Sequence, residues 1–396
     1  MKLKLGATGA IALAAASIGV LIPIMRILVE QAGAGSTAAG VFTASHVLGG
    51  VVGAAFGARA LRRAGSARAL AIVALLGSVG VTLAMAAVSS LAIRIGLRFL
   101  DGGCHLLAIT ALVAAATSGD ATLRARRAVT MGVAIVLGIA GGLGIGSQLG
   151  RPELALLVAA LLSAASLAVV VAQVEAEPLP EAAPARASDP RTRDRGPFAP
   201  GLLAFGERFI FGTLSIALPF LATPARVGMV LGVFMVSSVI AMPLARRYAL
   251  AASARRLAVR STLAFALALA AAGVVDILTS VPIALAWAAV AGAAAGALYA
   301  SALVLVARST VIDDRVRDMA TVHAAGNAGH ALGALVAGVL IAALPSMLAI
   351  VIPGVGIIAA ATLGVWITVP DAARDCPVIG GLARDDEPTA AIDATR

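Results

Sequence analysis

The sequence predicts an all-α integral membrane protein. Of its 396 residues, 60% are hydrophobic and only 13% are charged, and the mean hydropathy is +1.01. A soluble protein carries about 25% charged residues. The apolar residues form twelve continuous runs, and a helix of about 20 residues crosses the hydrocarbon core of a bilayer. Because the runs do not alternate with polar residues, we expect helices rather than the strands of an outer-membrane barrel.

Each of the twelve runs is expected to be one transmembrane helix. The first run continues well beyond the ~7–15 apolar residues of a secretory signal, so we expect it to be retained as a helix. The expected spans are 5–29, 39–58, 69–89, 91–118, 128–149, 153–173, 201–221, 227–245, 257–279, 281–307, 319–344 and 347–369.

A segment rich in proline and charge divides these runs into two sets of six. Residues 175–200 can neither span a membrane nor pack into a core, so they are predicted to form a cytoplasmic linker. The sequence thus predicts an N-terminal six-helix bundle at 1–174 and a C-terminal six-helix bundle at 201–370. Residues 371–396 are predicted to form a cytoplasmic tail.

The two halves resemble each other in glycine spacing, which indicates pseudo-symmetric bundles. Gly138 and Gly142 recur 191 residues later as Gly329 and Gly333. Small residues at this spacing let helices approach closely, so all four are candidates for helix packing and gating.

The basic residues predict the orientation of the chain. If the N-terminus is cytoplasmic, most of the Lys and Arg residues fall in cytoplasmic loops, the linker or the tail. This agrees with the positive-inside rule, so we expect a multi-pass protein of the cytoplasmic (inner) membrane with both termini cytoplasmic. Only Cys104 and Cys376 are cysteines, which excludes a disulfide framework.

The expected fourth span is unusual because it contains four ionisable residues in RIGLRFLDGGCH. On an ideal helix, Arg94, Arg98, Asp101 and His105 lie within about 60° of arc. Charges in lipid cost at least a few kcal/mol each, so this stripe should face protein or a water-filled cavity. Two interpretations stay open. In one, Arg98 and Asp101 form a structural ion pair while Arg94 extends to the outer surface. In the other, the stripe lines the transport path, with Asp101 and His105 as proton carriers and Arg98 as a substrate ligand.

A milder polar face is expected in the eleventh span. His323, Asn327 and His330 also lie within one narrow arc. Histidine titrates near neutral pH, so this face suits proton coupling or an anionic substrate. A histidine in an apolar helix can equally be a core residue, and both alternatives stay open.

Three further groups lie in other spans. Glu207 is a second proton-carrier candidate in the seventh span; its neighbour Arg208 points about 100° away, so the two are not expected to pair. His46 in the second span is a candidate substrate ligand. Arg26 and Glu30 are expected to form an external surface pair. Asp276 is expected to be solvated at the outer end of its helix.

The architecture and several motifs resemble the major facilitator superfamily. GARALRRAGSAR, from Gly57, is similar to the loop signature after the family's second helix, although Arg62 stands near the position of its aspartate. RFLDG, from Arg98, is similar to the fourth-helix motif that is associated with proton coupling. LGIAGGLGIG, from Leu137, is similar to the glycine-rich antiporter motif, with Leu143 in place of its proline.

The resemblance implies a secondary active transporter that works by alternating access between two bundles, with the first, fourth, seventh and tenth helices around the cavity. The leading hypothesis is proton-coupled export of a small organic molecule, and the alternative is proton symport for uptake of a small, possibly anionic, metabolite. A membrane-embedded sensor or assembly subunit that transports nothing is a third hypothesis. The sequence has no phosphate-binding loop and no enzyme constellation. We therefore expect no enzyme activity, no cofactor and no metal.

The expected partners are a small-molecule substrate, protons and the lipid bilayer, with no nucleic acid. The chain is expected to be a monomer.

Overall fold

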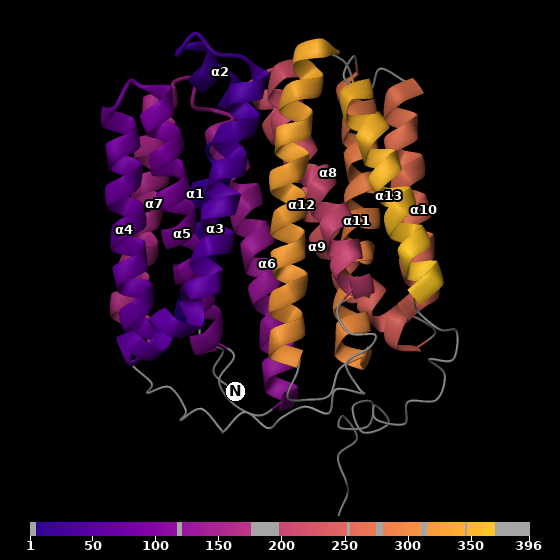
Figure 1. Cartoon of the computed structure of the whole chain (residues 1–396), viewed down its shortest axis with the longest axis horizontal. Coiled ribbons are helices and arrows are strands. Elements are labelled where there is room, and N and C mark those ends of the chain that lie inside the picture. The colour runs from indigo at the N-terminus through magenta and orange to yellow at the C-terminus, as the bar shows by residue number, and fades with distance from the viewer. Residues whose placement is uncertain are drawn as a thin grey trace, which may run out of the picture.

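The computed structural model describes residues 5–116, 121–175, 198–251, 254–274, 280–309, 315–344 and 347–368. In this part of the chain every regular element is a helix (Figure 1). The helices are α1 (Leu5–Gly19), α2 (Met25–Glu30), α3 (Ser36–Ala64), α4 (Ala67–Ala87), α5 (Leu91–Ala116), α6 (Ala121–Gly146), α7 (Pro152–Gln173), α8 (Phe198–Leu221), α9 (Pro224–Ala251), α10 (Ala254–Val274), α11 (Val281–Ser309), α12 (Arg315–Ala343) and α13 (Leu348–Thr368). The predicted linker and the tail 371–396 lie almost wholly outside the described residues, as does Asp276.

Ten of the described helices are long and apolar enough to cross a membrane. Two shorter apolar helices, Gly6–Gly19 and Thr130–Gly146, lie in the first and fifth predicted spans. The prediction of one continuous helix over 5–29 was wrong, because α1 ends at Gly19 and α2 begins at Met25. Pro23 lies between them and has no N–H to continue the helical hydrogen bonds, which accounts for the break. The prediction of an all-helical membrane protein is confirmed, while the count of twelve spans stays a prediction.

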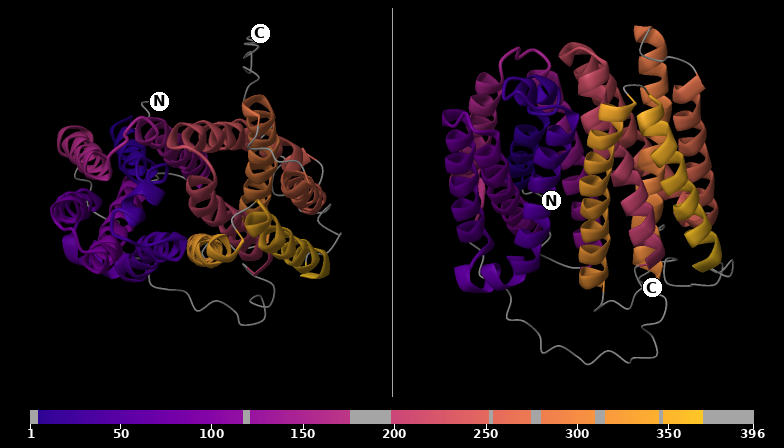
Figure 2. Two further views of the ribbon diagram at one scale, coloured as in Figure 1. Left: turned by 90° about the horizontal axis from the view of Figure 1, so that it is seen from above. Right: turned by 45° about the horizontal axis from the view of Figure 1, so that its top comes forward.

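The helices form two side-by-side groups, α1–α7 and α8–α13, which Figure 2 shows from above. The basic pairs Arg62-Arg63 and Arg246-Arg247, which the sequence places in loops after the second and eighth predicted spans, lie within helices instead. Arg62 and Arg63 lie in the last turn of α3, and Arg246 and Arg247 lie within α9. A glycine with a positive φ, Gly65, ends α3 in the left-handed conformation that only glycine adopts without strain.

The same close helix packing occurs at matching positions of the two halves. Gly138 and Gly142 on α6 lie directly against the carbonyl oxygens of Ala12 and Ala16 on α1. In the second half, Gly329 and Gly333 on α12 lie against the carbonyls of Phe205 and Phe209 on α8. A side chain at any of these glycines would overlap the facing backbone, so the 191-residue repeat in the sequence corresponds to a repeated helix contact.

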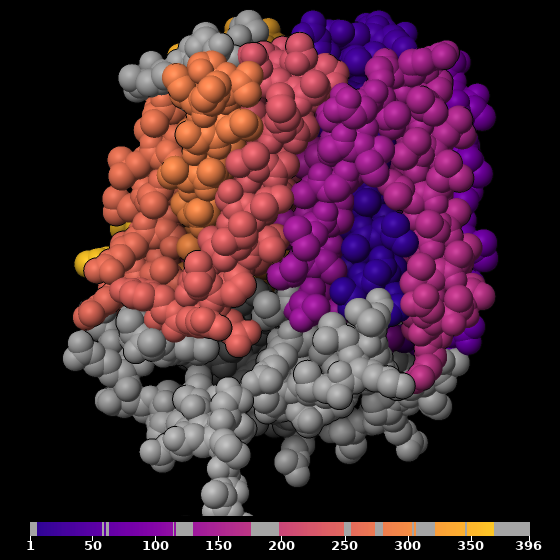
Figure 3. Space-filling model, turned by 180° about the vertical axis from the view of Figure 1, so that it is seen from behind, coloured from indigo at the N-terminus to yellow at the C-terminus, as the bar shows by residue number. Residues whose placement is uncertain are grey.

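The two halves meet at the end of the molecule that contains the start of α3. There Ser36 donates a hydrogen bond to the carbonyl of Gly338 on α12 over 2.8 Å, and Gly40 lies against the carbonyl of Ala334. At the same end, Gly228 on α9 lies against Leu143 of α6 and against Ser147, the residue that follows α6. Figure 3 shows α6 and α9 side by side along this junction. The direction of the helices places this end opposite the residues that flank the predicted linker (Figure 1).

Candidate functional site

The polar stripe of α5 faces the interior of the N-terminal half, between α3 and α4. Glycines allow this arrangement, because Gly102 on α5 lies against the carbonyl of His46 and Gly49 on α3 lies against the carbonyl of Phe99. Backbone contact of this kind brings the His46 side chain within reach of Asp101. All four predicted stripe residues are buried.

Asp101 is the centre of this cluster, and its hydrogen-bond partners lie on α5 and α4. Its Oδ2 accepts a hydrogen bond from Arg98 Nη1 over 2.6 Å, and its Oδ1 accepts one from Ser78 Oγ over 2.7 Å. Thr82 Oγ1 donates to the same Oδ1 over a longer 3.4 Å. A carboxylate that accepts several charge-assisted or hydroxyl hydrogen bonds is well compensated for the loss of water. Asp101 is thus stabilised as an anion in this conformation.

Arg98 has an aromatic neighbour as well as its carboxylate partner. Its guanidinium lies over the Phe42 ring, 5.6 Å from the ring centre, while its buried Nε has no hydrogen-bond partner. Phe42 belongs to the same buried apolar cluster as Ile216 on α8 and Ala334 on α12. The Arg98 guanidinium therefore contacts, through the Phe42 ring, the apolar cluster at the junction between the halves.

The two histidines of the N-terminal half lie beside this ion pair. His46 Nδ1 is 3.2 Å from Asp101 Oδ2, although no hydrogen bond is formed at that nitrogen. The His105 ring is 5.8 Å from the His46 ring, centre to centre. A proton released from Asp101 would meet imidazole groups first, which is the arrangement that a short relay requires.

Arg94 does not extend to the surface, as the structural interpretation of the stripe assumed. It is buried, and its Nε donates to the carbonyls of Met85 and Val88 over 3.2 and 2.6 Å. Carbonyls at the C-terminal end of a helix lack helical partners, so Arg94 caps α4. The charge of Arg94 in the stripe is therefore explained by this structural role.

A second charged cluster lies in the C-terminal half. Glu207 and Arg208 on α8 do form an ion pair, with Arg208 Nε 3.2 Å from Glu207 Oε2, so the expectation that they would not pair was wrong. The long Arg208 side chain bends across the helix surface, and its guanidinium lies 5.6 Å from the ring centre of Tyr299 on α11. Glu207 is buried, and its Oε2 has no hydrogen bond. This carboxylate is far less well compensated than Asp101.

The polar face of α12 continues the surface that joins the halves. On an ideal helix His330, Asn327 and His323 lie within about 40° of Ala334, the residue that Gly40 of α3 contacts. Their exposure increases toward the linker end, from partly buried His330 and Asn327 to exposed His323. The His330 ring also packs edge-on against Phe211, with 5.3 Å between ring centres. One face of α12 thus contacts α3 near Ala334 and carries polar groups of increasing exposure toward the linker end.

The structure brings together some of the predicted residues and keeps others apart. His46, Arg98, Asp101 and His105 form one cluster, and Glu207 lies in the other half. Sequence reasoning missed Ser78, Thr82, Phe42 and Tyr299. Ser78 and Thr82 are spaced i, i+4 in an apolar span, which was a usable signal for a shared polar face. Arg26 and Glu30 form the predicted exposed pair over 2.7 Å.

The described residues contain no group of three or more His, Cys, Asp or Glu side chains that could hold a metal ion. The chemistry that the two clusters offer is proton exchange at carboxylates and imidazoles, and binding of anions by Arg98 or Arg208.

Comparison with known proteins agrees with this architecture. The family model of the Major Facilitator Superfamily matches residues 198–379. Among solved structures, a D-xylose-proton symporter is similar with a TM-score of 0.73 and 15% identity, covering 93% of this chain and 97% of the other. The nucleoside transporter NupG is similar at 0.66 and 12%, covering 93% and 99%. The human organic anion transporter MFSD10 (TETRAN) is similar at 0.67 and 17%, covering 92% and 98%. No curated protein sequence matches the chain. The family model thus matches the C-terminal half of the chain, and the solved structures share the fold of the whole described chain.

Proposed function

We propose that this chain is a member of the major facilitator superfamily, whose family model matches residues 198–379, and that it is a secondary active transporter that exports a small organic molecule in exchange for protons. The proposal rests on one observation above all: an Asp–Arg pair with two neighbouring histidines is buried beside the junction of the halves. Ionisable groups inside a membrane span are costly and mark ion or substrate pathways.

Alternating access supplies the transport step. The halves contact each other at one end through Ser36, Gly40, Ala334 and Gly338. Backbone-to-backbone packing of this kind can part and re-form without leaving large side chains unpaired. Rocking of the halves about the substrate would open the end where Ser36 contacts Gly338. It would close the opposite end, which the linker flanks and toward which His323 lies.

Coupling is proposed to follow from exchange of partners at Arg98. In the symport alternative, a carboxylate or phosphate of the substrate replaces Asp101 on the guanidinium, and Asp101, released from Arg98, takes up a proton, so that substrate and proton are bound together. In export by exchange, the two occupy the site in turn, and Asp101 is deprotonated while substrate is bound. The exchange never leaves an unpaired charge in a site of low dielectric constant, which would cost several kcal/mol. His46 and His105 are placed to deliver that proton. Glu207, whose Oε2 has no hydrogen bond, is the second proposed proton site.

The direction of transport has two candidates. The glycines of α6, which resemble an antiporter motif, favour export. The donors that line the face of α12, together with Arg98, favour an anionic substrate and are equally compatible with proton symport for uptake. Both candidates use the groups proposed to contact substrate: Arg98, His46, His323, Asn327 and His330.

Metabolite profiling distinguishes the two directions and identifies the substrate at the same time. Cells with and without the protein are compared by mass spectrometry of the cytoplasm and the medium, each with and without a protonophore. Export predicts a compound that accumulates inside the cells that lack the protein, and uptake predicts depletion there. If no small molecule differs between the strains under any condition, the transport proposal fails.

The orientation is part of the same proposal. With both termini and the linker in the cytoplasm, a reporter that is active only outside the cytoplasm should be silent when it is fused at Ala183. An active reporter at that position would reverse the assignment of the two ends.

A further inference from the structure

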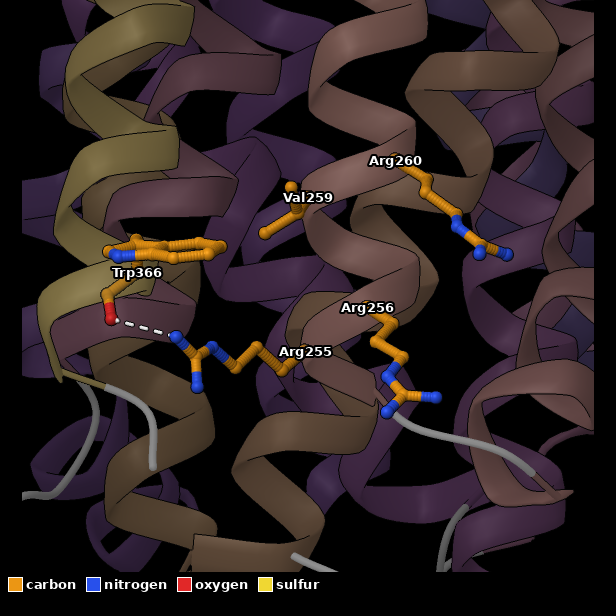
Figure 4. A pocket seen from close by; sticks show the side chains of 5 residues that line it. All are labelled: Arg255, Arg256, Val259, Arg260 and Trp366. Atoms are coloured by element: carbon orange, nitrogen blue, oxygen red, sulfur yellow. Dashed lines mark hydrogen bonds between the residues drawn. The ribbon is translucent and has the colours of Figure 1, made fainter. Parts of the chain in front are cut away.

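A basic cavity lies on the outside of the C-terminal half, where the first turns of α10 meet the end of α13. Its lining consists of Arg255, Arg256, Val259, Arg260 and Trp366 (Figure 4), and its volume is about 280 Å³. The two candidate spans that border it are Arg255–Gly273 and Leu348–Ile367. The cavity therefore lies where two membrane spans reach the membrane surface, at the end that the predicted linker flanks.

Two of the arginines are held in place by aromatic residues on neighbouring helices. Arg255 Nη2 donates to the carbonyl of Trp366 over 3.2 Å, and its guanidinium lies 4.8 Å from the centre of the Trp366 ring. Arg260 Nη1 donates to the Tyr248 hydroxyl on α9 over 2.8 Å. Figure 4 shows Arg255 extending toward Trp366, and Arg256 and Arg260 extending together from the other side of the helix.

The charge of this region favours an anion. Arg256 and Arg260 are spaced i, i+4, where like charges repel each other. All three cations lie in the first two turns of α10, at the positive end of the helix dipole, and the first turn contains no acidic residue. A bound phosphate group would offset the repulsion between the arginines and their unfavourable position at the positive end of the helix dipole. It would also accept hydrogen bonds from the planar guanidinium groups.

The surface next to the cavity is apolar and exposed along the axes of α10 and α13. Leu263 and Leu267 follow Val259 at intervals of four residues on α10 and are 52% and 66% exposed. Leu363 lies one turn before Trp366 on α13 and is 59% exposed. An acyl chain that leaves the cavity toward the membrane interior would contact these side chains. Trp366, which is 61% exposed, lies in the last turn of α13, and tryptophans at the ends of membrane spans commonly contact headgroups.

We propose that this cavity binds the phosphate headgroup of an anionic phospholipid, with one acyl chain along Leu263 and Leu267. Clusters of basic residues between membrane helices are suited to this class of lipid. The apolar surface favours a lipid over a free phosphate, because a soluble anion would gain nothing from the exposed leucines. The cavity shares no residue with the proposed transport site, so the lipid proposal does not depend on the proposed function.

The test measures thermal unfolding of the purified full chain in detergent after addition of phosphatidylglycerol, phosphatidylcholine or inorganic phosphate. Native mass spectrometry counts the lipids that stay bound. The cavity variant combines Arg255→Gln, Arg256→Gln and Arg260→Gln. The matched control combines Arg59→Gln, Arg63→Gln and Arg247→Gln, which removes the same charge from exposed arginines at the same end of the molecule.

We expect phosphatidylglycerol to raise the unfolding temperature of the wild type more than phosphatidylcholine does. The cavity variant should lose most of this shift and its retained phosphatidylglycerol, and the control should keep both. If the triple variant does not fold, the single variant Arg256→Gln, which leaves the contacts of Arg255 and Arg260 in place, should show a smaller loss in the same direction.

Several results would overturn the proposal. Equal losses in both triple variants would show that only bulk charge matters, and an unchanged shift in the cavity variant would place the lipid elsewhere. An equal shift with inorganic phosphate alone would assign the cavity to a soluble anion. If phosphatidylglycerol raises the unfolding temperature only after deletion of 371–396, the cavity arginines would bind the acidic residues of the tail rather than a lipid.

Discussion

Two carboxylates are buried in the part of the chain that the structure describes, one in each half, and they differ in how fully their charge is compensated. Asp101 accepts hydrogen bonds from Arg98, Ser78 and Thr82 and has His46 beside it. Glu207 has only its sequence neighbour Arg208, and its Oε2 accepts no hydrogen bond. The backbone packing of the halves is repeated, whereas these polar clusters are not. The close helix packing is thus common to both halves, whereas the surroundings of the buried carboxylates differ between them.

The Arg98 substitutions should have the largest effect on binding. Arg98→Ala is expected to abolish substrate binding, because truncating a buried, hydrogen-bonded charge costs about 2–5 kcal/mol. Arg98→Lys should retain part of the affinity, since the charge survives but the planar fork does not. Equilibrium binding to the monodisperse protein, with the compound identified by profiling, measures both. Unchanged affinity in Arg98→Ala would leave the pair with a structural role only.

Asp101→Asn should destabilise the protein strongly. The change leaves Arg98 as a buried cation without its partner, which costs about 3–5 kcal/mol of unfolding free energy. Reversible denaturation in mixed micelles measures the cost. The double variant Arg98→Leu, Asp101→Asn serves as the control and should recover most of the stability, because neither charge is left unpaired. If Asp101→Asn is as stable as the wild type, Asp101 does not compensate the buried charge of Arg98.

The repeated glycine contacts should respond alike in both halves. Gly142→Ala and Gly329→Ala each place a methyl group against a facing carbonyl, and overpacking of this kind costs about 1–3 kcal/mol. Gly141→Ala is the matched control on α6, because open space surrounds that position. The same denaturation experiment applies. Because alanine favours a helix over glycine, a cost at Gly141 equal to that at Gly142 would mean that contact with the facing carbonyl does not set the values.

Glu207→Gln should have the smallest effect on stability. The carboxylate makes no hydrogen bond through Oε2, and Arg208 keeps its contact with Tyr299. We expect a change of less than about 1.5 kcal/mol, the value of one ordinary hydrogen bond. A loss as large as that of Asp101→Asn would remove the contrast between the two clusters.

The sequence alone predicted the helical membrane fold, most spans and the close-packing glycines, because these follow from hydropathy and from the absence of side chains. It also placed Arg94, Arg98, Asp101 and His105 on one face. It could not show that Arg94 caps α4 or that Phe42 covers Arg98, since both contacts join helices whose relative rotation is set by packing. The pairing of Glu207 with Arg208 was mispredicted because the angle between adjacent positions ignores how far a long side chain can bend.

Gradient-driven transport tests the central claim that Asp101 carries the coupled proton. The wild type and Asp101→Asn are reconstituted in vesicles, and uptake of the profiled compound is measured with and without an imposed pH gradient, next to exchange without a gradient. We predict that Asp101→Asn loses the response to the gradient while exchange stays measurable. A full response to the pH gradient in Asp101→Asn would contradict the account.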